Sequence, residues 1–250
     1  MSREEVVGGL HAVEALLAHA PERIKRLQVA ADSSDARLAG IVARARTLGI
    51  SVEPLRRPRL DRAHEGLNHQ GVVALTLPRP RAGESELAGL VASGGDLFLA
   101  LDGVTDPHNL GACLRSADAA GARAVIVPRD RSAALTPAAA KVASGAAETM
   151  PLVAVVNLAR TLRELRDAGL WVVGLAGDVD APLYRIDLTL PTVLVLGAEG
   201  EGLRRLTREN CDLLAAIPMA GSVGSLNVSV AAGVALFEAV RQRSATGVGT

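Results

Sequence analysis

Polar side chains gather in three loops of the C-terminal half of the chain that are marked by glycine or asparagine. They offer amide, guanidinium, carboxylate and hydroxyl groups, a set that suits hydrogen bonding to a nucleotide-like ligand and its phosphates. Each loop follows an apolar run and opens or precedes a helix-like stretch. The three segments are residues 109–115, 196–202 and 217–229.

The first loop carries Asn109 at the start of an expected helix and Arg115 about one and a half turns further on. Taken by itself, Asn109 is expected to cap the helix by accepting a backbone N–H. Arg115 is either an ordinary surface residue or a phosphate ligand, because its planar guanidinium suits phosphate geometry. Gly111 allows this helix to pack closely against a neighbour. Taken alone, this motif leaves these interpretations open.

The second loop places Glu199 among the glycines of residues 197–202. Glycine permits unusual backbone angles and the close approach of a ligand. The G-x-G-x-x-G order is missing, and no acidic residue follows at the spacing of a dinucleotide site, so such a site is disfavoured. A tight strand-to-helix turn explains the glycines but not Glu199.

The third loop is the most specific of the three. It combines Gly221 and Gly224 with three small polar residues, Ser225, Asn227 and Ser229. A helix cap needs one polar residue, so Ser225 or Asn227 alone would suffice. The run of three predicts a binding loop.

Beyond residue 96, short apolar runs alternate with helical periodicity, which predicts an α/β domain with a parallel sheet covered on both faces. Ligands of such sheets bind beyond the carboxyl ends of the strands, where all three loops lie. The last helix is expected to group its large apolar residues on one face. We expect strands at 97–101, 124–127, 171–175, 193–196 and 213–217, helices at 110–120, 137–147, 158–168 and 226–243, and Leu226, Val230, Val234, Phe237 and Val240 on that face.

The sequence predicts two domains. Residues 1–77 form a small α/β domain, residues 78–95 form a linker rich in proline, glycine and charges with a short helix at 85–92, and residues 96–250 form the larger domain. The densest basic cluster lies in the first domain and is either a solvated loop or an RNA contact. It consists of Arg56, Arg57, Arg59 and Arg62.

Composition narrows the class of protein. The formal net charge is zero, which argues mildly against a general nucleic-acid coat. Cys113 and Cys211 have no metal or redox spacing and are expected to be reduced packing residues of a cytoplasmic protein. We expect no membrane span, and the five histidines lack the spacing of metal ligands.

Together, the three loops resemble the three-motif signature of the SpoU/TrmH class of the SPOUT superfamily, over residues 97–244. The resemblance implies methylation of an RNA ribose 2′-oxygen with S-adenosylmethionine, RNA rather than DNA as partner, a homodimer, and a trefoil knot near the third loop. Segments 7–13 and 69–74 resemble the L30e-type RNA-binding domain of these enzymes. Segments 141–148 and 226–232 are in combination similar to members that modify a guanosine in the peptidyl-transferase loop (domain V) of 23S rRNA.

The resemblance also implies roles for individual residues. Because a guanidinium stays protonated, we expect Arg115 to orient the RNA phosphate and stabilise negative charge on the oxygen rather than to act as a free base. The methyl donor is expected to contact mainly the backbone at Gly197, Ile217 and Leu226. The expected catalytic residues are Asn109, Arg115, Glu199, Ser225 and Asn227.

Three alternatives remain open. A sister enzyme would methylate tRNA or another rRNA nucleotide. A catalytically silent RNA-binding assembly factor is disfavoured by the intact polar set. A nicotinamide-dependent dehydrogenase is disfavoured by the missing dinucleotide fingerprint.

Overall fold

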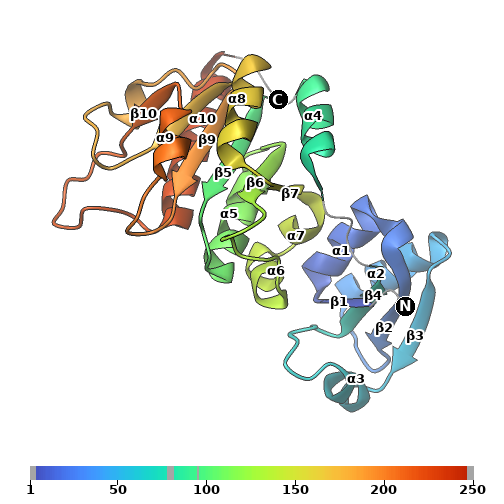
Figure 1. The fold of residues 1–250 in the computed structure, drawn as a ribbon. Coiled ribbons are helices and arrows are strands. Elements are labelled where there is room, and N and C mark those ends of the chain that lie inside the picture. The colour runs from blue at the N-terminus through green and yellow to red at the C-terminus, as the bar shows by residue number, and fades with distance from the viewer. Residues whose placement is uncertain (1–3, 78–81, 95, 247–250) are drawn as a thin grey trace. The chain divides into compact units, whose positions relative to one another are not determined.

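The computed structural model describes residues 4–77, 82–94 and 96–246, so residues 78–81 and 95 of the predicted linker lie outside the described part. Contacts divide the chain into two units, residues 1–80 with 144–149, and residues 81–143 with 150–250 (Figure 1). A helix, α4 (Glu84–Ala92), occupies the place of the short helix expected near the end of the linker. The domain boundaries at 77 and 96 stay a prediction, and the contacts add residues 144–149 to the first unit.

The first unit is built on a mixed four-stranded sheet in the order β1-β4-β2-β3. Only the β2–β3 pair is parallel. The strands are β1 (Glu5–Gly8), β2 (Ile24–Ala30), β3 (Ser51–Leu55) and β4 (Val72–Thr76). The helices are α1 (Leu10–His19), η1 (Pro21–Arg23), α2 (Ala36–Thr47), α3 (Arg57–Ala63) and the short α7 (Ala146–Thr149).

Each face of this sheet has its own apolar core. Helices α1 and α2 cover one face with Leu16 and Ile41, and α3 covers the other with Leu60. The basic run expected as a loop is largely helix α3, and its four arginines are exposed. Helix α2 is capped by Asp35, whose carboxylate accepts the backbone N–H groups of Arg37 and Leu38.

The second unit contains the predicted parallel sheet, with six strands in the order β10-β8-β9-β5-β6-β7 and every pairing parallel. Five strands lie where the sequence predicted them. The strands are β5 (Leu97–Asp102), β6 (Ala124–Pro128), β7 (Leu152–Val155), β8 (Trp171–Leu175), β9 (Thr192–Gly197) and β10 (Leu213–Ala215).

Helices cover both faces of this sheet, as expected (Figure 1). Alternate strand residues such as Phe98 and Val193 share a core with α4 and with Leu162 of α8 (Leu158–Asp167). The opposite face receives α5 (Pro107–Ala119) and α10 (Val228–Thr246), which pack on each other, with α6 (Pro137–Ala143) against α5. The remaining short helices are η2 (Leu183–Arg185) and α9 (Arg205–Glu209).

The strand order departs from that of a dinucleotide-binding sheet. In the usual doubly wound order the strands on one side follow the chain outward from the centre. Here β9 lies between β5 and β8, so β9 is nearer the centre of the sheet than β8, although it comes later in the chain. This arrangement weakens the dehydrogenase alternative further.

Two expectations about helices are wrong. The stretch 137–147 is broken after α6, where Ser144 adopts a left-handed backbone (φ 56°) that a helix does not accommodate. The expected apolar face of the last helix is not its buried face, because Val230 and Phe237 are 51% and 49% exposed. The buried apolar residues of α10 are mostly small: Val228, Ala232, Ala235, Leu236 and Ala239.

None of the helices in the described ranges combines the length and apolar character that crossing a bilayer requires. Within the same ranges, no group of three or more His, Cys, Asp or Glu side chains is arranged to hold a metal ion.

Candidate functional site

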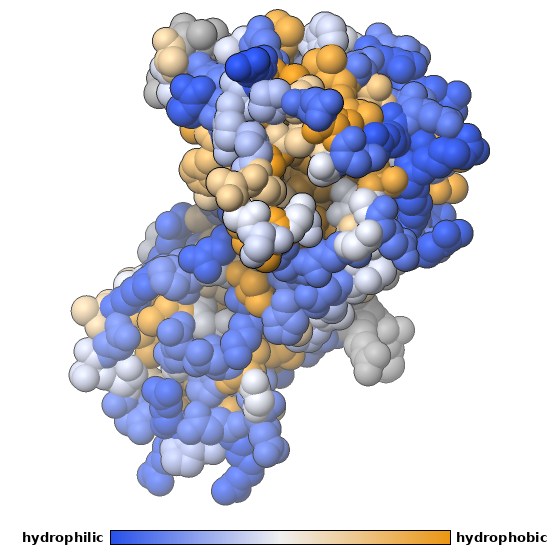
Figure 2. Space-filling model, turned by 90° about the vertical axis from the view of Figure 1, so that its left-hand side faces the viewer, coloured by the Kyte–Doolittle hydropathy of each residue, from blue (hydrophilic) through white to orange (hydrophobic). Residues whose placement is uncertain are grey.

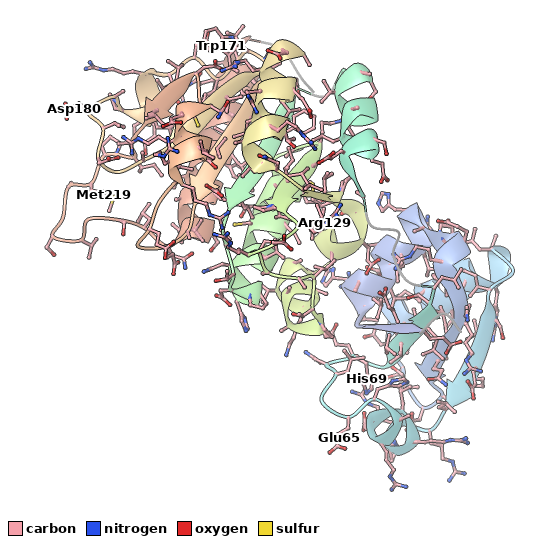
Figure 3. The ribbon with its side chains drawn as sticks, in the orientation of Figure 1. Glu65, His69, Arg129, Trp171, Asp180 and Met219 are labelled. Carbon is pink, nitrogen blue, oxygen red and sulfur yellow. The ribbon has the colours of Figure 1, made fainter. Side chains whose placement is uncertain are left out.

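All three motifs follow strands of the second unit's sheet at its carboxyl edge, and the first, residues 109–115, lies within helix α5 rather than in a loop. They follow β5, β9 and β10, and the loop after β8 joins them there. The loops after β8 and β10 touch, since Pro182 pairs with Ala216 and a Cβ added to Gly177 would lie 3.8 Å from the carbonyl oxygen of Gly224. Figure 3 labels Asp180 and Met219 on these two loops.

Asn109, Glu199 and Asn227 form one hydrogen-bonded cluster. The Asn227 Nδ2 donates to Glu199 Oε1 at 2.5 Å and to Asn109 Oδ1 at 2.9 Å. Asn109 Nδ2 and the backbone N–H of Val228 also donate to Glu199 Oε1, at 3.4 and 3.3 Å. One carboxylate oxygen therefore joins the first, second and third loops.

Asn227 has a second function as a helix cap. Its Oδ1 accepts the backbone N–H of Ser229 at 2.9 Å and the Ser229 hydroxyl at 2.6 Å, at the start of α10. Asn109 does not cap α5. That helix begins two residues earlier, and its cap is Asp106, whose Oδ1 accepts the backbone N–H of His108 at 3.0 Å. The side chain of Asn109 is therefore free to form its hydrogen bonds with Glu199 and Asn227.

Gly197 allows the second loop to pack closely against its own backbone. A Cβ at Gly197 would lie 2.0 Å from the carbonyl carbon of Gly202, and Gly202 N donates to the Ala198 carbonyl at 2.9 Å. The loop is folded back on its own strand, with Gly200 and Gly202 at positive φ. Gly111 of the first loop meets α6 in the expected way, since a Cβ there would lie 2.4 Å from the Ala139 carbonyl oxygen.

A cavity of about 260 Å³, which we call the loop pocket, opens between the loops that follow β8, β9 and β10. Its wall is mostly glycine, alanine and larger apolar residues, so main-chain donors and acceptors stand beside apolar surface, a lining typical of small-ligand sites. In Figure 2, apolar surface in the upper part of the view lies among hydrophilic residues. The expected site residues in its lining are Gly197, Glu199, Ile217, Ser225 and Leu226.

Arg115 lies apart from both the cluster and the loop pocket. Its side chain is exposed on α5, and it forms no hydrogen bond or ion pair with any residue that the structure describes. The structure therefore brings together seven of the eight residues predicted for the site, and places Arg115 outside the pocket of its own chain.

Asp102 is a site residue that the sequence reasoning missed. It ends β5 at the carboxyl edge, its side chain is fully buried, and its Oδ2 accepts the backbone N–H of Arg204 at 2.9 Å. The Arg204 guanidinium lies 3.5 Å from Asp102 Oδ1. Since Arg204 closes the second motif loop, this pair ties that loop to the central strand. The sequence feature that could have indicated Asp102 is its position as an acidic residue directly after the apolar run of residues 97–101.

A second cavity, of about 440 Å³, lies beside the loop pocket, and we call it the arginine pocket. Both cavities are lined by Ala198, Glu199 and Val228, so Glu199 stands in the wall between them. The arginine pocket also contains Asn109, the backbone after β5 and two cations. These cations are Arg131 and Arg204.

Neither cysteine provides a nucleophile here. Burial raises the pKa of the Cys113 thiol to about 12. Burial, with smaller contributions from the carboxylates of Asp212 and Asp102, raises the pKa of Cys211 to about 12. Both thiols are free and stay protonated near neutral pH, as expected of packing residues.

Comparison with known proteins agrees with this geometry. Residues 96–237 match the model of the SpoU rRNA Methylase family, and residues 6–81 match that of the RNA 2′-O ribose methyltransferase substrate binding domain. The chain belongs to the SpoU rRNA methylase family. This confirms the resemblance seen in the three loops.

The curated relatives include 23S rRNA (guanosine-2′-O-)-methyltransferases named RlmB. The protein from Pseudomonas syringae pv. tomato is 58% identical over 98% of both chains, and that from Escherichia coli K12 is 54% identical over 96% of this chain and 99% of its own. Among solved structures, the SpoU methyltransferase AviRb from Streptomyces viridochromogenes, in complex with the cofactor AdoMet, is 28% identical with a TM-score of 0.79. That match covers 97% of this chain and 91% of the other.

Proposed function

We propose that this protein transfers the methyl group of S-adenosylmethionine to the ribose 2′-oxygen of a guanosine in 23S rRNA, within the peptidyl-transferase loop of domain V. The observation that carries the proposal is the Asn109–Glu199–Asn227 cluster in the wall of the loop pocket, in a chain more than 50% identical to RlmB proteins over nearly its whole length. No nucleophile or metal of the protein is needed, since the donor supplies an activated methyl group and alignment supplies much of the rate.

The loop pocket suits the methyl donor. Gly197, Ile217 and Leu226 would hold it mainly through their backbone groups, while apolar neighbours such as Met219 and Leu175 cover its uncharged parts. When bound, S-adenosylmethionine supplies a sulfonium-activated methyl group. The carboxylate of Glu199 lies at the pocket wall and favours a cationic ligand beside it.

The cluster residues position the acceptor. Glu199 Oε1 is occupied by three N–H donors, which leaves Oε2, to which no described residue donates, to accept from the ribose hydroxyl. Asn109 holds the sugar, and Ser225, exposed in the pocket wall, completes the polar rim. These residues orient a weak nucleophile so that its proton can leave as the bond forms.

Arg115 completes the site in a homodimer. It is exposed on α5, and α5 packs along α10, whose Val230 and Phe237 expose apolar surface. Burial of that surface against a second copy would bring Arg115 of each chain toward the partner's pocket, where its cation orients an RNA phosphate and stabilises charge on the oxygen. We also assign a trefoil knot to the loops after β8 and β10, which touch one another where α10 begins.

The first unit binds the RNA. Its match to a substrate-binding domain and the exposed arginines of α3 support an L30e-like module that contacts the phosphate backbone. The substrate places the enzyme in the cytoplasm.

Methylation assays with mapping of the modified nucleotide test the proposal. Purified protein, S-adenosylmethionine and either a domain V fragment of 23S rRNA or total tRNA are incubated, and the 2′-O-methylated position is located. Modification of one domain V guanosine supports the proposal, whereas modification of tRNA alone would favour the sister-enzyme alternative. Calorimetry with S-adenosylmethionine and with NAD separates a methyltransferase from a dehydrogenase, and donor binding without turnover on either RNA would favour an assembly factor.

A further inference from the structure

The arginine pocket is a second cavity that adjoins the loop pocket. The two cavities share only Ala198, Glu199 and Val228, so a ligand in one meets a ligand in the other across the Glu199 side chain. Methyl transfer needs donor and acceptor on opposite sides of the migrating carbon. A cavity adjoining the donor's is therefore the place for the acceptor.

The two cations of this cavity have different roles. Arg204 is already engaged, because its backbone and guanidinium both meet the buried carboxylate of Asp102. Arg131 is exposed and forms no hydrogen bond or ion pair with any described residue. Its backbone has φ 56°, a conformation that residues other than glycine rarely adopt and that is often found at functional sites. Arg131 is thus a cation in an uncommon backbone conformation that has no partner among the residues the structure describes.

The remaining polar groups suit a sugar rather than a second anion. Asn109 and Glu199 also line this cavity, and Glu201 adds a carboxylate that accepts hydrogen bonds from hydroxyl groups but repels phosphate. A ribose fits against the carboxylates and Asn109, with its phosphate directed to Arg131. Asp106, the other acid in the lining, is occupied as the cap of α5.

We propose that the arginine pocket binds the acceptor ribose of the RNA and that Arg131 binds the phosphate attached to it. This inference rests on the proposed function and adds to it a substrate-binding residue outside the three motifs. Arg131 acts on RNA binding within its own chain, in contrast to the role of Arg115 across the homodimer.

The test compares Arg131→Asn with Arg129→Asn in the full-length protein. Asparagine tolerates positive φ, so the first variant removes the charge without forcing the backbone to change. Arg129 is the matched control because it lies two residues earlier, is exposed and lines neither cavity. A third variant, Arg131→Lys, keeps the charge but not the guanidinium fork. Each protein is assayed for KM and kcat on the domain V fragment, for the salt dependence of RNA binding, and for donor affinity by calorimetry.

Arg131→Asn should raise the KM for RNA at least about fivefold and lower the slope of log K against log salt by about 0.7, with donor affinity unchanged. Arg131→Lys should recover part of the loss, and Arg129→Asn should match the wild type. The inference is overturned if the wild-type protein is active and Arg131→Asn and Arg129→Asn have the same KM for RNA and the same salt dependence of RNA binding. A wild type that binds no S-adenosylmethionine, or methylates no RNA, instead defeats the proposed function itself.

Discussion

Asn109 and Asn227, 118 residues apart in the chain, share a 2.9 Å hydrogen bond between Oδ1 and Nδ2. Glu199 accepts from both side chains, so the three loops are held in one arrangement before any ligand arrives. Preorganised polar groups of this kind lower a barrier because they need not reorient during the reaction.

Removal of the shared acceptor should therefore slow methyl transfer. Glu199→Ala leaves two side-chain amides and one backbone N–H without their partner, and each hydrogen bond to a charged group contributes about 1.5–3 kcal/mol. We expect the single-turnover rate to fall at least about tenfold. Glu209→Ala, on the exposed helix α9 and in neither cavity, is the control. A wild-type rate in Glu199→Ala would remove the cluster from the mechanism.

Gly197→Ala should disrupt donor binding. The added methyl group would lie 2.0 Å from the Gly202 backbone, so the loop that walls the pocket must move. Gly221→Ala is the matched change in the third loop, where no atom lies within 4 Å of the added Cβ and φ is not positive. Calorimetry with S-adenosylmethionine should show a large loss for the first variant and little change for the second. Equal affinities would show that the folded-back loop is not needed for binding.

Two helix glycines should respond to alanine in opposite directions. At Gly111 the new Cβ meets the Ala139 carbonyl oxygen at 2.4 Å, and such overpacking costs about 1–3 kcal/mol. At Gly233 of α10 the nearest atom is Ser116 Oγ at 3.7 Å, so the better helix propensity of alanine should stabilise by about 0.5–1 kcal/mol. Thermal unfolding should show a lower Tm for Gly111→Ala and a higher one for Gly233→Ala. A fall in both would mean that α10 is packed more tightly than described.

The cysteines should react slowly in the native protein. With their pKa values raised to about 12, only about one thiol in 10⁴ is ionised at pH 8, and the thiolate is the reactive species. A disulfide reagent should label the folded protein slowly, and faster as pH rises toward 12, whereas denaturant should expose both thiols at once. Rapid stoichiometric labelling of the native protein at pH 8 would contradict the assigned burial.

Arg115→Ala should abolish turnover but leave the affinity for S-adenosylmethionine nearly intact, since Arg115 lines neither the loop pocket nor the arginine pocket. If the residue acts across a homodimer, mixing Arg115→Ala with Glu199→Ala chains should regain up to about a quarter of wild-type activity, because half of the dimers then carry one intact site. The separate variants provide the baseline. Recovery of no activity on mixing would place Arg115 in the site of its own chain, and intact turnover of Arg115→Ala would remove it from the reaction.

The order of elements was predictable because long apolar runs and helical periods are local properties. Strand β8 begins and ends at the residues expected, Trp171 and Leu175. The buried face of α10 was not predictable from its large residues, since the helix packs through alanines and exposes Val230 and Phe237. Close helix packing favours small side chains, which carry little signal in a hydropathy pattern.

The motif residues were recognised because they occur in short runs, but their geometry required the fold. Asp106 rather than Asn109 caps α5. Proline is favoured in the first turn of a helix, so the helix begins at Pro107, directly after Asp106. Asp102 and Arg131 escaped notice because each is a single charge outside the glycine-marked loops. Only the meeting of β5, β9 and their loops shows what these charges face.

The dependence of Glu199 on Asn227 also bears on when the enzyme becomes competent during its synthesis. A ribosome delivers the chain from its N-terminus, and the first and second loops can fold before the third has been made. Until Asn227 and Val228 have emerged and docked, the Glu199 carboxylate has only its Asn109 donor, and one wall of the pocket is missing. We therefore expect the site to assemble only after the third loop has left the ribosome.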